Sequence, residues 1–77
     1  MYFLKIEGHP GDKYNKGTWI NLRQIISLNI VEETATRYRV MIHYANGGTT
    51  AAYRKTEEEA QMYVEYLLGE IAEASEG

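Results

Sequence analysis

The fold is decided by the stretch YANGGT, residues 44–49, which lies between two segments of alternating apolar and polar residues. An Asn-Gly pair is the strongest short signal for a β-hairpin, because both central residues of a type I′ turn need a positive φ angle. We therefore predict antiparallel strands over about 37–45 and 49–55. Counting outward from a two-residue turn places Arg39 directly opposite Arg54 on the outer face of the sheet.

A helix is predicted directly after this hairpin, over about 57–74. Thr56 and Glu59 have the spacing of a capping box, and the glutamates that open the segment complement the positive end of the helix dipole. One stripe at helical spacing is apolar and should close over the sheet. It consists of Ala60, Val64, Leu67, Ile71 and Ala74, flanked by Tyr63 and Leu68. Gly69 is costly inside a helix, by about 1 kcal/mol, so either the helix ends near Leu68 or a neighbour approaches closely there.

Alternating patterns predict three more strands upstream, over about 2–7, 18–22 and 25–32. The segment 8–17 concentrates Gly, Pro, Asp and Asn and is expected to be a loop. Asn21 and Gln24 have the capping pattern of a tight helical turn that re-aims the chain. We thus expect a single α+β domain over 1–77: a small antiparallel, strongly bent sheet or partial barrel of four or five strands, packed by one C-terminal amphipathic helix.

Charge is divided sharply along the chain. All eight Lys and Arg residues lie in 1–55 with only four acids, whereas 56–77 holds seven Glu and no base. The first part therefore carries +4 and the second −7, which together give the net charge of −3. This division predicts a basic sheet that carries an acidic helix, and it determines how the molecule would orient towards a charged partner.

The size of the chain and its lack of cysteine limit how it can be stabilised. A domain of 77 residues buries only roughly 60% of the surface that its unfolded chain exposes. Such small domains usually gain stability from a disulfide, a metal or a partner subunit, and the lack of Cys excludes the disulfide and any thiolate metal site. The N-terminus lacks the features of a signal peptide, and no stretch approaches the ~20 apolar residues of a membrane span. We expect a soluble, cytoplasmic protein with no membrane partner.

The order of these elements resembles that of the small FlbD-type bacterial proteins and of many short phage-encoded proteins. The matching region runs from WINLRQI, residues 19–25, through the Asn46-Gly47 hairpin to Glu58-Glu59. The resemblance is a pattern of secondary structure. The first strand and the loop over 8–17 depart from it.

Catalytic and metal-binding patterns are weak in this sequence. His9 and His43 lie 34 residues apart, and the other possible metal ligands are only ordinary carboxylates. This weak ligand set favours structural roles for the two histidines. Ser27 would lie beside His43 on the outer face if the third and fourth strands pair there. Yet there is no nucleophile elbow, no evident third group and no phosphate-binding glycine pattern. We predict no enzyme activity, no catalytic residue, no metal and no cofactor.

The outer sheet face offers one candidate binding site. It is predicted to carry Arg37, Arg39, His43 and Arg54 together with Ser27, Asn29 and Thr50. These side chains could bind the phosphates of a nucleic acid, while Phe3, Trp19 or Tyr14 could stack on its bases. Alternatively, the arginines pair with Glu32, Glu33 and the helix-opening glutamates. The negative net charge favours such pairing, because general nucleic-acid binders usually carry excess positive charge.

Exposed aromatic residues offer a second candidate site. Phe3 and Trp19 should face away from the core, and Met62, Tyr66 and Gly69 share an outward strip of the helix. Tyr, Trp, Met and Arg are enriched in protein interfaces, although a curled sheet could instead tuck Phe3 and Trp19 inside. We therefore favour a non-catalytic protein-binding module that acts by protein–protein contact, as a homo-oligomer or as a phage-type inhibitor or adaptor. The alternative is a nucleic-acid or nucleotide binder that uses the arginine face.

Overall fold

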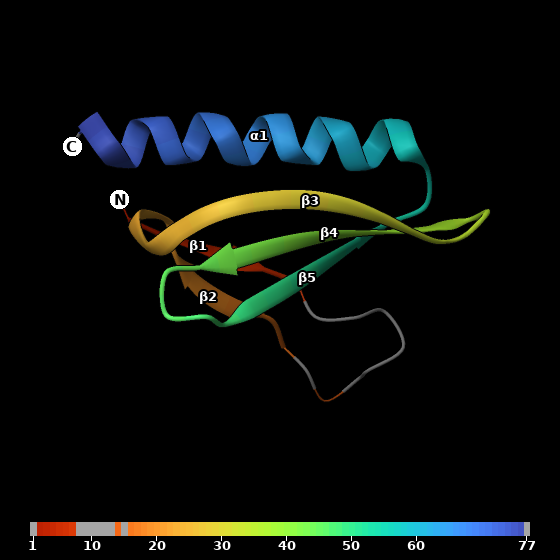
Figure 1. The fold of residues 1–77 in the computed structure, drawn as a ribbon, viewed down its shortest axis with the longest axis horizontal. Helices are drawn as coiled ribbons and strands as arrows, with labels where there is room; N and C mark the ends of the chain where they lie inside the picture. The colour runs from red at the N-terminus through yellow and green to blue at the C-terminus, as the bar shows by residue number, and fades with distance from the viewer. Residues whose placement is uncertain (1, 8–13, 15, 77) are drawn as a thin grey trace.

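The computed structural model describes residues 2–7, 14 and 16–76, and it contains five strands, one short 3₁₀ helix and one long α-helix (Figure 1). The elements are β1 (Phe3–Ile6), β2 (Thr18–Asn21), η1 (Leu22–Gln24), β3 (Ile25–Thr34), β4 (Arg37–Tyr44), β5 (Thr49–Arg54) and α1 (Glu57–Glu76). The bounds agree with the predicted ones to within two residues at every end. Most of the predicted loop over 8–17, including His9, lies outside the described residues.

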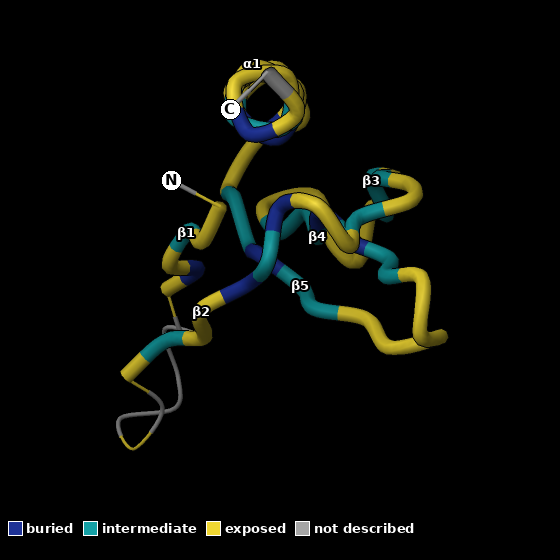
Figure 2. The backbone as a smooth tube through the Cα atoms, turned by 90° about the vertical axis from the view of Figure 1, so that its left-hand side faces the viewer, coloured by how far each residue is buried: buried dark blue, intermediate teal, exposed yellow. Residues whose placement is uncertain are grey.

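The strands form two antiparallel sheets, and α1 covers both. β1 pairs with β2, while the second sheet has the order β3-β4-β5. Viewed towards the end of α1, the β1–β2 hairpin and the larger sheet lie side by side beneath the helix (Figure 2). The predicted α+β class and antiparallel pairing are confirmed. The strongly bent single sheet or partial barrel is not confirmed, because the described strands form two separate sheets and neither one closes.

The register of the β4–β5 hairpin differs from the predicted one by a single residue. Arg39 lies opposite Tyr53 instead of Arg54, and Arg54 lies opposite Tyr38. The turn is a three-residue loop: the Tyr44 carbonyl oxygen accepts from Gly47 N at 3.0 Å, and Gly47 takes the positive φ of 91°. This is a type I turn followed by a bulge glycine. Because side chains alternate along a strand, the shift moves Arg54 and Thr50 to the helix side and Tyr53 to the outer face.

Two bulges in β3 change which of its side chains face the helix. The pairing with β4 shifts between Ile25 and Ser27 and again between Glu32 and Thr34. Each shift leaves one extra residue in β3, as a β-bulge does. Ile26 is therefore turned out to solvent and is 68% exposed, although its apolar neighbours pack on the core. An unbroken alternation would put Ile26 on the same face as Leu28 and Ile30, and the bulge at Ile26 prevents this.

The core lies between the two sheets and the inner face of α1. Its buried members are Ile6, Ile20, Leu22, Val40, Ile42, Ala52, Ala60, Leu67 and Ala74. The predicted helix stripe is confirmed, since Ala60, Leu67 and Ala74 are buried while Val64 and Ile71 pack on the core. Leu68 is the exception: it is 54% exposed, because its position on the helix turns it about 100° away from Leu67.

The start of α1 is capped as predicted, but its end is not where the glycine suggested. Thr56 Oγ1 accepts from Glu59 N at 3.1 Å, and Glu59 Oε2 accepts from Lys55 N at 3.3 Å. The helix then continues through Gly69 to Glu76. A Cβ atom at Gly69 would meet nothing within 4 Å, so no described part of this chain makes the close approach that a glycine permits.

Arg23, a residue of η1, contacts the C-terminal end of α1. Asn21 Oδ1 accepts from Arg23 N at 3.0 Å and thereby starts the predicted helical turn. Arg23 Nε donates to the Ala74 carbonyl oxygen at 3.1 Å, and the guanidinium Cζ lies 3.6 Å from the centroid of the Tyr2 ring. The last turn of α1 contains no basic residue, so Arg23 supplies the positive charge that favours the negative end of a helix dipole.

Candidate functional site

The outer strip of α1 consists of Met62, Tyr66 and Gly69. Their spacing of four and three residues places them on one side of the helix, on successive turns. Met62 is 61% exposed and Tyr66 is 48% exposed. Gly69 lies next along the strip and leaves its backbone uncovered. The structure therefore places these three predicted interface residues together on an exposed face.

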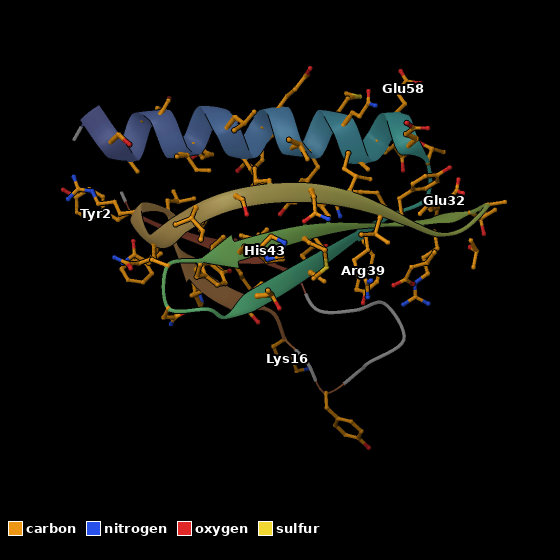
Figure 3. All side chains as sticks on the ribbon, viewed as in Figure 1. Tyr2, Lys16, Glu32, Arg39, His43 and Glu58 are labelled. Atoms are coloured by element: carbon orange, nitrogen blue, oxygen red, sulfur yellow. The ribbon has the colours of Figure 1, made fainter. Side chains whose placement is uncertain are left out.

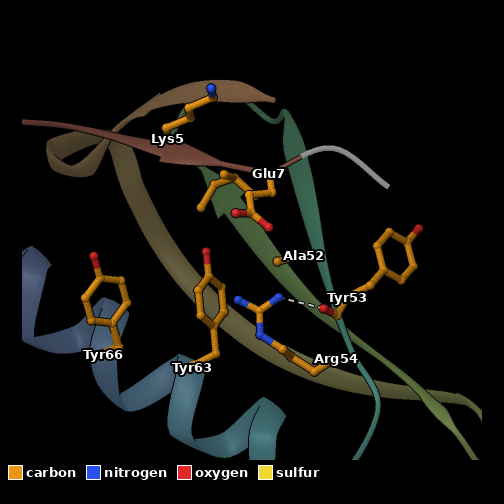
Figure 4. A pocket seen from close by; sticks show the side chains of 8 residues that line it. Lys5, Glu7, Ala52, Tyr53, Arg54, Tyr63 and Tyr66 are labelled. Atoms are coloured by element: carbon orange, nitrogen blue, oxygen red, sulfur yellow. Dashed lines mark hydrogen bonds between the residues drawn. The ribbon is translucent and has the colours of Figure 1, made fainter. Parts of the chain in front are cut away.

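Arg54 lies at the edge of this strip, between β5 and α1. Its Cζ is 4.1 Å from the centroid of the Tyr63 ring, and its Nη1 donates to the Tyr53 carbonyl oxygen at 2.6 Å. Tyr63 in turn stacks on Tyr66, with ring centroids 6.0 Å apart. Figure 4 shows the Glu7 carboxylate turned towards the same space. Arg54 is thus part of the aromatic surface of α1 and not of the outer sheet face.

Three neighbouring hollows meet at Arg54. A hollow of about 220 Å³ lies between β1, β5 and α1, lined by Lys5, Ile6, Glu7, Ala52, Tyr53, Arg54, Tyr63 and Tyr66. A second, of about 400 Å³, follows the outer strip and is lined by Arg54, Glu59, Met62, Tyr63 and Tyr66. A third, of about 680 Å³, is lined by Thr34, Thr36, Arg37, Tyr53, Arg54, Lys55 and Glu59. Arg54 therefore contributes to all three of these hollows, and both candidate residue sets supply side chains to their linings.

The tyrosine hydroxyls near this surface are suited to donating hydrogen bonds, and not to transferring protons near neutral pH. Burial raises the pKa of Tyr63 above its ordinary value, while the Arg54 charge acts in the opposite sense. The pKa of Tyr38 is raised first by its hydrogen bond to the Glu32 carboxylate, and that of Tyr44 by burial. All three shifts move away from neutral pH, so these hydroxyls stay protonated and can donate hydrogen bonds.

The arginines of the outer sheet face are already paired. The Glu33 carboxylate lies 3.2 Å from Arg37 Nε and 3.1 Å from Arg39 Nη1. The side chains of Arg37 and Arg39 are 39% and 34% exposed, and Arg37 Cζ also lies 4.6 Å from the centroid of the Tyr53 ring. Because Glu33 is the extra residue of a β3 bulge, it can reach both cations. The structure thus keeps Arg37 and Arg39 together on the outer face, whereas Arg54 turns to the helix side and shares with Arg37 the lining of the third hollow.

His43 lies on the same outer face and is directly opposite Ser27, as the strand pairing requires. Its Nε2 is 2.6 Å from Asn29 Oδ1. The imidazole is therefore engaged by an amide instead of by a hydroxyl nucleophile. Within the residues that the structure describes, no group of three or more His, Cys, Asp or Glu side chains could hold a metal ion.

Phe3 and Trp19 lie on the outward face of the β1–β2 hairpin. Phe3 is 51% exposed and Trp19 is 64% exposed, so neither is tucked beneath a curled sheet. Neither residue lines the three hollows around Arg54. The hairpin therefore carries a separate aromatic surface, and the five predicted interface residues do not form one patch.

Reasoning from the sequence did not predict the two bulges of β3, the exposure of Leu68 or the contact of Arg23 with α1. The bulge positions of Ile26 and Glu33 leave no mark in an alternating pattern. The exposure of Leu68 could have been found, because the helical angle already sets it apart from the stripe that contains Leu67. The contact between Arg23 and Ala74 joins residues 51 apart in the chain, and no local pattern indicates it.

Comparison with known proteins identifies no relative of this chain. The chain matches no protein-family model, no curated protein and no solved structure. The resemblance to FlbD-type proteins therefore stays a similarity in the order of elements. In the described residues, no helix is both long and apolar enough to cross a membrane.

Proposed function

We propose that this chain is a non-catalytic protein-binding module whose contact surface is the outer strip with the neighbouring Arg54 and Tyr63. The observation that carries the proposal is the exposure of Met62 and Tyr66 beside an aromatic-stacked arginine. Tyr, Met and Arg are the side chains that interfaces gather, and contact over an uncovered glycine adds close packing. The partner is a second copy of the chain or another protein, which includes the role of a phage-type inhibitor or adaptor in the cytoplasm.

The alternative, a nucleic-acid or nucleotide binder, has less support. Glu33 neutralises part of the charge of Arg37 and Arg39, and Arg54 lies on the other side of the sheet. Without Arg54, the outer sheet face is a mixed surface on which Tyr53, Asn29 and His43 already have partners. Binding to a phosphate backbone depends on cations that are free to replace counterions.

The test is a comparison of two glutamate substitutions on α1. Tyr66→Glu places a charge in the outer strip, whereas Leu68→Glu places the same charge at a similarly exposed position on another side of the helix. Light scattering over a range of protein concentrations measures self-association, and crosslinking to an identified partner measures binding to another protein. We expect Tyr66→Glu to abolish whichever contact is present, while Leu68→Glu leaves it intact.

Equal effects of the two substitutions would show that the outer strip is not the contact surface. A wild-type chain that stays monomeric and does not bind the peptides described below would defeat the proposal, and salt-sensitive oligonucleotide binding by that chain would favour the alternative function. Far-ultraviolet circular dichroism of both variants checks that α1 is still folded.

A further inference from the structure

Glutamates line both sides of the outer strip. At 100° per residue, Glu58 and Glu65 lie on one side of Met62 and Gly69, and Glu59 and Glu70 lie on the other. Glu73 follows Tyr66 and Gly69 along the strip itself. The helix carries no Lys or Arg, so its exposed apolar centre is framed by negative charge.

None of these carboxylates forms an ion pair within the described molecule, although Glu59 Oε2 accepts a hydrogen bond from Lys55 N. The ion pairs found among the described residues join Glu33 to Arg37 and Arg39, and none involves a glutamate of α1. The cation beside the strip, Arg54, is engaged by the Tyr63 ring and the Tyr53 carbonyl oxygen. Figure 3 shows Glu58 pointing away from the sheet, on the opposite side of the molecule from Arg39 and His43.

This charge pattern argues against a second copy as the occupant. A closed two-fold dimer uses the same patch on both chains, so a dimer through the outer strip would place one acidic helix against another. Like charges that face each other are destabilising. The outer sheet face, which carries Arg39 and His43, lies on the opposite side of the molecule from Glu58 (Figure 3). It cannot contribute to a symmetric contact through the outer strip.

We propose that the outer strip binds a basic amphipathic helix of another protein. Its apolar stripe would lie on Met62 and Tyr66, and its flanking Lys and Arg side chains would pair with the glutamates on either side. A helix fits because the strip is straight along α1 and because the open backbone at Gly69 allows a close approach. This inference rests on the proposed function and names the chemistry of its partner.

The experiment uses three synthetic helical peptides that share one stripe of leucines. Their other positions carry lysine, glutamine or glutamate. Fluorescence anisotropy of labelled peptide measures binding to the wild-type chain at about 50 mM and about 500 mM NaCl, a range over which exposed charges become screened. We expect the lysine peptide to bind at least about tenfold more tightly than the glutamine peptide at low salt, and most of that advantage to vanish at high salt.

A pair of double variants tests whether the position of the charges matters. Glu65→Gln with Glu73→Gln removes two carboxylates beside the strip. Gln61→Lys with Ser75→Lys changes the net charge by the same amount on the side of α1 that carries Leu68. We expect the first variant to weaken binding of the lysine peptide by about fivefold to tenfold, and the second to weaken it by less than about twofold.

Each outcome separates this inference from the proposed function. Equal binding of the lysine and glutamine peptides would retain the outer strip as a contact surface but overturn the basic partner. The chain could instead dimerise in a concentration-dependent way that Tyr66→Glu abolishes, and bind no peptide. That result would also overturn the basic partner, and it would show that the outer strip is a homodimer interface. If no peptide binds below about 1 mM and the chain is a monomer, both proposals fail.

Discussion

The guanidinium of Arg54 lies over the ring of Tyr63, with Cζ 4.1 Å from the ring centroid. The contact joins the last residue of β5 to the second turn of α1. It exists only because the hairpin loop has three residues, which turns Arg54 to the helix side. A shift of one residue in the hairpin would return Arg54 to the outer face and leave the aromatic pair of Tyr63 and Tyr66 without a cation.

The pKa of Tyr63 gives the stability of the fold a dependence on alkaline pH. Burial raises this pKa above the ordinary value of 10.0, so the stability that comes from the neutral hydroxyl is complete below pH 10 and is lost as the pH rises through the folded-state pKa. We expect the free energy of unfolding of Tyr63→Phe to fall less between about pH 9 and about pH 11 than that of the wild type.

Urea denaturation at each pH measures this difference. Tyr14→Phe serves as the control, because the Tyr14 side chain is 82% exposed. If Tyr14→Phe and Tyr63→Phe change the pH dependence equally, burial of the Tyr63 hydroxyl is not its cause.

The double ion pair of Glu33 provides a direct test of the nucleic-acid alternative. Glu33→Gln releases Arg37 and Arg39, and we expect the free energy of unfolding to fall by less than about 1 kcal/mol because both pairs are partly exposed. We also expect the variant to show no salt-sensitive binding to a single-stranded oligonucleotide. Fluorescence anisotropy at two salt concentrations measures that binding.

Glu32→Gln is the matched control, since it makes the same charge change at the neighbouring residue, whose carboxylate accepts from the Tyr38 hydroxyl at 2.7 Å. If Glu33→Gln binds oligonucleotide tightly at low salt and Glu32→Gln does not, the arginine face is able to bind nucleic acid once Glu33 is removed, and the alternative function gains support.

The hairpin shows how far sequence reasoning can reach. The Asn46-Gly47 pair correctly predicted two antiparallel strands, but it is compatible with two turn geometries. In the type I′ turn both residues need a positive φ, whereas in the observed loop only Gly47 has one. The choice depends on packing across the whole sheet, where Val40 and Ala52 meet the core together. Local preferences do not contain that information.

The candidate site was predictable to the extent that it lies on a helix. The fixed angle per residue of an α-helix is enough to predict from the sequence that Met62, Tyr66 and Gly69 share one outward strip. The position of Arg54 depended on the hairpin register and was wrong for that reason. The pairing of Glu33 with both Arg37 and Arg39 was foreseen only as a general possibility, because the bulge that allows it disrupts the period of the strand.

Two adjacent leucines test the orientation of α1. Leu67 is fully buried and Leu68 is 54% exposed. We expect Leu67→Ala to lower the free energy of unfolding by about 2 to 4 kcal/mol, and Leu68→Ala to lower it by no more than about 0.5 kcal/mol. Thr56→Ala, which removes the helix cap, should fall between them at about 1 kcal/mol. Chemical denaturation measures all three, and a smaller effect for Leu67→Ala than for Thr56→Ala would contradict the observed packing.

Gly69→Ala distinguishes an uncovered helix from one that is covered by a partner. The added Cβ would meet nothing within 4 Å in this chain, and alanine favours a helix interior over glycine by about 0.5 to 1 kcal/mol. We therefore expect Gly69→Ala to raise the free energy of unfolding of the isolated chain by that amount in urea denaturation. If a partner helix approaches closely over Gly69, the same methyl group should weaken binding of the lysine peptide while Ala72→Ser, on the neighbouring side of α1, leaves it unchanged. Stabilisation with no loss of binding would show that the partner contacts Met62 and Tyr66 without reaching the glycine, and a loss of stability would show that α1 is not continuous through this position.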